Sequence, residues 1–78
     1  MSLGISLRMA VETDLEAAIR LLREGEERLR EQMKLIQTLV RDGKPTGSAM
    51  DLCRYTRKTL EEIQTHINYL RETANRRE

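Results

Sequence analysis

The first half of the chain carries a mostly apolar series of residues whose spacing alternates between four and three, the spacing of one helix face. The series is Leu15, Ile19, Leu22, Glu26, Leu29, Met33, Ile36 and Val40. The second half repeats the alternation through Ala49, Cys53, Thr56, Leu60, Ile63, Ile67, Leu70 and Ala74. Heptad patterns of this kind are typical of helices that pack against each other. We therefore expect two long helices in contact, and we call each series the seam of its helix.

Capping and stop signals bound the first predicted helix. Thr13 is followed three residues later by Glu16, which is the spacing of a capping box, so the helix should begin here. Gly43 can adopt the left-handed conformation that ends many helices, and Pro45 prevents the helix from resuming. We expect this helix over about 14–42.

A second pair of signals bounds the other helix. Ser48 and Asp51 have capping spacing, and Thr46 is a competing cap, so we expect a helix over about 48–74. Because the connection between the helices is short, they should run antiparallel. The predicted fold is all-α, an antiparallel helical hairpin.

Glu26 is the one charged residue in the first seam. Folding the chain back at the turn places Leu29 beside Leu60 and Glu26 beside Ile63. We expect Glu26 to fix the register, as a polar seam residue can, and a ligand or proton site inside the bundle is the alternative. His66 lies about one turn from Ile63, so a contact between Glu26 and His66 is geometrically possible.

The chain divides into three parts by pattern. Residues 13–75 form the predicted hairpin, and residues 76–78 are a charged tail. Residues 1–12 alternate apolar and polar side chains, which is a strand period, but no second strand is indicated for pairing. We expect a poorly ordered N-terminal arm, with a strand or helical turn laid on a partner as the alternative.

A second stripe of apolar and small residues adjoins each seam, and a hairpin on its own would expose both stripes to water. Charge is concentrated on the remaining face of the first helix, which is typical of a solvated surface. Two chains are therefore predicted to associate as a twofold homodimer, a four-helix bundle. The expected interface residues are Ala18, Leu21, Gly25, Gln32, Leu35, Leu39, Leu52, Tyr55, Thr59, His66 and Tyr69. Docking on the helices of another protein is the alternative.

Composition narrows the function classes. The 78 residues are 35% charged and 38% hydrophobic, which fits long helices and leaves no room for an enzyme fold with its own cleft. A net charge of +1 provides no strong attraction for nucleic acid or an anionic membrane. No apolar run is long enough to span a membrane, so we expect a cytoplasmic protein without a membrane partner.

No metal, cofactor or catalytic group is predicted. Glu62 precedes His66 by four residues, whereas di-iron bundle sites need a Glu three before each His. Cys53 and His66 would lie roughly 20 Å apart along one helix, too far to share an ion or to form a catalytic dyad. We expect Cys53 to pack near the turn as a small hydrophobe.

Residues 19–32, IRLLREGEERLREQ, begin a pattern that continues through Leu35, Ile36, Leu39, Asp42, Gly43, Thr46 and Ala49. This pattern resembles small two-helix hypothetical proteins of alphaproteobacteria, in which Gly-Glu, Leu or Ile, and Gln precede an Asp-Gly helix stop. The resemblance implies a cytoplasmic bacterial helical hairpin associated with signalling or stress responses, and it brings no established activity. It is looser over the second helix. The chain also departs from the pattern at Arg20 and Leu21, near which a His often stands.

The sequence therefore favours a non-enzymatic interaction or regulatory module that forms a homodimer. The alternative is a small RNA-binding four-helix-bundle regulator, similar in architecture to plasmid copy-number hairpin dimers. Basic residues for such a role gather at Arg54, Arg57 and Lys58 and at the chain end, but acidic residues interleave elsewhere.

Overall fold

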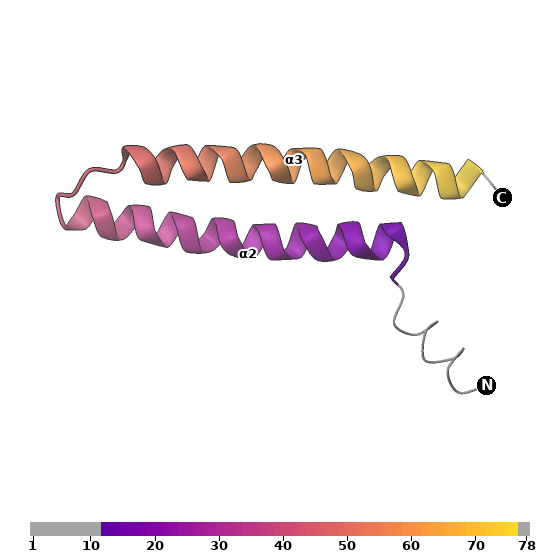
Figure 1. Cartoon of the computed structure of the whole chain (residues 1–78), viewed down its shortest axis with the longest axis horizontal. Helices are drawn as coiled ribbons and strands as arrows, with labels where there is room; N and C mark the ends of the chain where they lie inside the picture. Colours follow the sequence, from indigo (N-terminus) through magenta and orange to yellow (C-terminus); the bar gives the residue numbers. More distant parts are fainter. Residues whose placement is uncertain (1–11, 77–78) are drawn as a thin grey trace, which may run out of the picture.

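Two long helices make up the part of the chain that the computed structural model describes, residues 12–76. They are α2, Asp14–Arg41, with 28 residues, and α3, Gly47–Arg76, with 30 residues. The helices lie side by side and run in opposite directions, with the start of α2 and the end of α3 at the same end (Figure 1). This confirms the predicted all-α helical hairpin. The predicted N-terminal arm lies outside the described residues except for Glu12, as does the tail beyond Arg76.

The predicted capping box fixes the start of α2. The Thr13 backbone N–H donates to Glu16 Oε1 at 2.9 Å, and the Glu16 backbone N–H donates to Thr13 Oγ1 at 3.1 Å. These two bonds satisfy donors that the first turn of a helix leaves without an intrahelical acceptor.

Gly43 ends α2 in the left-handed conformation, with φ of 68°. Its N–H donates to the Val40 carbonyl at 3.1 Å, and the Lys44 N–H donates to the Leu39 carbonyl at 2.9 Å. This pair of bonds is the Schellman motif, which satisfies carbonyl groups at a helix end. A residue with a Cβ would be strained at this φ, which explains the stop predicted from the sequence.

The bounds of α3 differ slightly from those predicted. The helix begins at Gly47, directly after Thr46, so the competing cap position marks the start and Ser48 lies inside the helix. It continues two residues beyond the predicted end, because no helix breaker follows Ala74 and Arg76 in the last turn suits the helix dipole.

The seam of α3 is the predicted one. Its buried residues are all members of the heptad series expected to face the first helix, namely Cys53, Thr56 and Ile67.

The seam of α2 is rotated from the predicted one. The helix buries three residues that we had assigned to the dimer interface, Ala18, Gly25 and Gln32. Glu26 and Met33 are exposed, as is Val40, with 65% of its surface accessible. Placing Gly25 in the seam instead of Glu26 leaves the carboxylate in water, where it incurs no burial cost.

Gly25 lies directly against Leu60 of α3. A Cβ at Gly25 would lie 2.5 Å from Leu60 Cδ2, so the missing side chain is what lets Leu60 approach α2. The predicted neighbour of Leu60, Leu29, lies one turn further along α2, and the pairing of these two residues stays a prediction. Gly25 is costly inside a helix, and this close contact offsets that cost.

The core of the hairpin is thin. Among residues 12–76, Ile67 is the one large side chain that is fully enclosed, with 1% of its surface exposed. The other buried apolar residues, Ala18 and Cys53, are small. Many large apolar side chains instead remain exposed: Leu21, Met33, Leu35, Val40, Met50, Leu52, Tyr55 and Tyr69.

Candidate protein interface

A groove between the two helices brings the two predicted stripes together. Its walls are formed by Leu21, Glu24, Gly25, Arg28 and Gln32 from α2, and by Leu52, Tyr55, Thr56, Thr59, Leu60 and Ile63 from α3. Leu21, Gly25 and Gln32 belong to the stripe of α2. Leu52, Tyr55 and Thr59 belong to the stripe of α3, so the two stripes lie on the same side of the hairpin. This side, with Leu35 added from the α2 stripe, is called the groove face below.

Large apolar side chains dominate the groove face. Leu21, Leu35 and Leu52 each expose about half of their surface, and Tyr55 exposes 69%. Isolated exposed apolar residues are ordinary, but several from two helices on one face indicate an interaction surface.

The remaining predicted interface residues are distributed unevenly. Leu39 and Thr59 are half-buried, whereas His66 and Tyr69 are exposed. The sequence prediction did not include Arg28 among the interface residues, although its spacing places it on the same stripe of α2 as Leu21, Gly25 and Gln32.

Gln32, like Thr56, is a buried polar residue of the groove. Only 8% of its surface is exposed, and among the described residues its Oε1 atom has no hydrogen-bond partner. A buried acceptor without a donor costs about 1–3 kcal/mol, so such groups are rare in stable folds. Gln32 therefore marks a position where a donor from outside the hairpin would stabilise it.

Arg28 lies one helical turn from Gln32 and lines the same groove. Its side chain is exposed, and within residues 12–76 no carboxylate or carbonyl pairs with it. Two neighbouring polar groups are already engaged. Glu24 pairs with Arg20 at 3.4 Å, and the Thr59 hydroxyl donates to the Tyr55 carbonyl at 3.1 Å.

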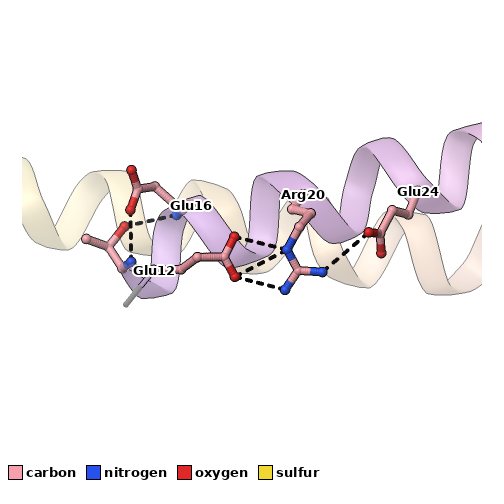
Figure 2. A network of polar contacts seen from close by, with 5 residues as sticks. Glu12, Glu16, Arg20 and Glu24 are labelled. Carbon is pink, nitrogen blue, oxygen red and sulfur yellow. Dashed lines mark hydrogen bonds and ion pairs between the residues drawn. The ribbon is translucent and has the colours of Figure 1, made fainter. Parts of the chain in front are cut away.

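Ion pairs lie along the exposed surface of α2, and one of them includes Glu24, which also lines the groove. Figure 2 shows Arg20 between Glu12 and Glu24, with its guanidinium 3.0 Å from Glu12 and 3.4 Å from Glu24. The hydrogen bond from Arg20 lowers the pKa of the Glu12 carboxyl below its ordinary value. These side chains are well exposed, so each pair adds little stability, but together they make a hydrated surface.

A second hollow lies on the other side of the hairpin, near the turn. It is lined by Met33, Ile36, Gln37, Met50, Cys53, Arg54 and Arg57. Cys53 is a buried free thiol here, which agrees with its predicted packing role. Arg54 is paired with Asp51 at 3.1 Å, and the thioether side chains are partly exposed.

The other sequence candidates do not form a site. Glu26 and His66 are both exposed, and no hydrogen bond or ion pair joins them in the described part of the chain. Within residues 12–76, no three His, Cys, Asp or Glu side chains gather where they could hold a metal ion. Neither α2 nor α3 contains an apolar stretch long enough to cross a membrane.

The resemblance to alphaproteobacterial two-helix proteins stays a prediction. Comparison of the chain with protein families, curated proteins and solved structures found no match.

Proposed function

We propose that the chain is a non-enzymatic interaction module that forms a homodimer through the groove face, giving a four-helix bundle. The single observation behind this proposal is the gathering of the exposed side chains Leu21, Leu52 and Tyr55 around one groove, while ion pairs occupy the outer face of α2. A second copy supplies a matching apolar face in a twofold arrangement, which is the commonest symmetry of soluble oligomers.

The thin core supports the same proposal. A hairpin of this length buries little apolar surface by itself, and small domains usually gain the missing stability from a disulfide, a metal or a partner. The chain has one cysteine, so an intrachain disulfide is impossible. A second hairpin would cover the exposed leucines and add the core that the first lacks. In this proposal the protein is cytoplasmic, where Cys53 stays a reduced thiol.

RNA binding is the alternative function. Arg54 and Arg57 flank the hollow near the turn, but Arg54 is paired with Asp51 and the net charge of the chain is only +1. Proteins that bind nucleic acid through phosphate contacts present a clearer excess of unpaired cations. The apolar groove face is therefore the stronger functional feature.

Sedimentation velocity with the variant Leu35→Glu tests the dimer. The wild type should sediment at twice the 9.1 kDa chain mass, whereas the variant should dissociate at least about 100-fold more readily, because a carboxylate would be buried unpaired. Its melting temperature should fall with its association. Gln37→Glu is the matched control, since it adds the same charge near the second hollow. A helical, monomeric wild type at micromolar concentration would refute the proposal.

A further inference from the structure

We infer that Gln32 and the partner's Arg28 form the polar contact that aligns the two hairpins in the dimer. This inference rests on the proposed function, because it assigns a specific pair to the proposed interface.

The first argument comes from the acceptor. Gln32 is more than nine-tenths buried, lines the groove, and keeps its Oε1 atom without a donor among residues 12–76. This oxygen is already shielded from water in the hairpin, so apolar side chains that cover the groove would leave it without a donor. An interface that forms here must therefore bring a donor to Gln32.

The second argument comes from the donor. Arg28 lines the same groove, and in the free hairpin its guanidinium is solvated and unpaired within the described residues. When a second groove face covers it, Arg28 loses water and needs an acceptor, because an unpaired buried charge is strongly unfavourable. Glu24 is already paired with Arg20, whereas Gln32 Oε1 is a buried acceptor of the groove that has no donor among residues 12–76.

Twofold symmetry joins these two requirements. In an isologous interface, any contact from residue 28 of one copy to residue 32 of the other occurs twice. Among the described residues, the groove of each hairpin carries a buried acceptor without a donor, Gln32 Oε1, and a cation without an acceptor, Arg28, one helical turn apart. Two copies of the same chain therefore satisfy both groups, whereas a purely apolar partner would satisfy neither.

The consequence is specificity of alignment. Apolar side chains can slide along one another at small cost, but a buried polar pair is satisfied in one register only, as polar seam residues are in coiled coils. The sequence suggested this role for Glu26. The structure moves it to Gln32, because Gln32 is buried and Glu26 is not.

A double-mutant cycle on the dimer dissociation constant tests the pair. Arg28→Met and Gln32→Met each leave one polar partner unsatisfied, so each single variant should weaken the dimer about tenfold. The double variant should return to within about threefold of the wild type, since an apolar pair of similar size replaces the polar pair. Tyr55→Phe is the control, because it removes an exposed hydroxyl of the same groove and should leave the coupling between Arg28 and Gln32 unchanged.

A spin label reports alignment separately. The label is attached at Lys58→Cys on the outer face of α3, in a Cys53→Ala background. With Arg28 and Gln32 in place, the distance distribution between the labels of the two copies should be narrow. In the Arg28→Met, Gln32→Met variant it should be broad. A dimer in which the two single effects simply add, or in which the distance stays narrow, would overturn the inference and leave the dimer proposal intact. A monomeric wild type would overturn both.

Discussion

The contact between Gly25 and Leu60 can be tested by adding one methyl group. In Gly25→Ala the new Cβ lies 2.5 Å from Leu60 Cδ2, whereas ordinary contacts begin near 3.4 Å. The Leu60 Cγ atom, at 3.6 Å, is already at an ordinary distance, so only the terminal methyl must move. The perturbation is therefore confined to one side-chain torsion.

Two opposing terms set the expected size of the effect. Replacing a helical Gly by Ala stabilises the helix by about 1 kcal/mol. Forcing Leu60 away from its preferred torsion costs about 0.5–1.5 kcal/mol. In the wild-type background the two nearly cancel, so Gly25→Ala should change the free energy of unfolding by less than about 0.5 kcal/mol.

Removing the clashing atom separates these terms. In a Leu60→Val background Cδ2 is absent, so Gly25→Ala should stabilise by the full value of about 1 kcal/mol. The assay is urea unfolding followed by circular dichroism, at one fixed chain concentration for all four proteins. Gly47→Ala is the control, since nothing lies within 4 Å of its added methyl, and its effect should be equal in both backgrounds. An equal effect of Gly25→Ala in both backgrounds would refute the proposed close contact.

Two further predictions concern the ends of α2. Gly43→Ala should lower the free energy of unfolding by about 1–2 kcal/mol because its φ of 68° disfavours a side chain, and Gly43→Asn should lose less; thermal melts that show no loss for Ala would contradict this. The pKa of the Glu12 carboxyl is lowered by the hydrogen bond from Arg20. The contribution of this pair to stability is therefore present above the ordinary pKa of 4.5 and is lost as the pH falls through the folded-state pKa. Melts across this acidic range should show a slightly smaller loss of stability for Glu12→Gln than for the wild type, and identical pH dependence would show that the pair contributes nothing.

The helices and the turn were predictable because their signals are local. Thr13 and Glu16 act on each other across one turn, and Gly43 imposes its own backbone conformation. No distant part of the chain is needed for either effect. The ends of α3 were less certain, since Thr46 and Ser48 are both reasonable caps and nothing after Ala74 breaks a helix.

The rotation of α2 was not predictable from apolar spacing. Two series overlap in this helix and share Leu22, Leu29 and Ile36, which are half-buried in the structure. Counting apolar residues favours the series with Met33 and Val40, because both are apolar, whereas of their counterparts Gln32 and Leu39 only Leu39 is apolar. Close packing of two helices instead rewards small residues opposite large ones. The signal that could have identified the correct face is the small pair Ala18 and Gly25, seven residues apart.

The groove was only partly predictable for the same reason. Leu52 and Tyr55 line the groove, and their place in an interface stays a prediction, whereas Gly25 and Gln32 also belong to the hairpin seam. A rotation of one helix decides which polar residues are buried, and it depends on contacts between residues distant in sequence. The lack of a hydrogen bond at Gln32 Oε1 therefore appears only once the two helices are packed.

Among residues 12–76, Ile67 is the one large side chain that is fully enclosed, so under the dimer proposal the folded fraction would depend on chain concentration. On the proposed dimer, most of the apolar surface that protects the chain is buried by association, so stability rises with chain concentration. At low expression, chains would open often and be exposed to proteases, which cleave the open form. At high expression, assembly would withdraw them from degradation. Under this proposal, the rate of degradation per chain would fall as the cellular concentration rises, since scarce chains would be removed faster than plentiful ones.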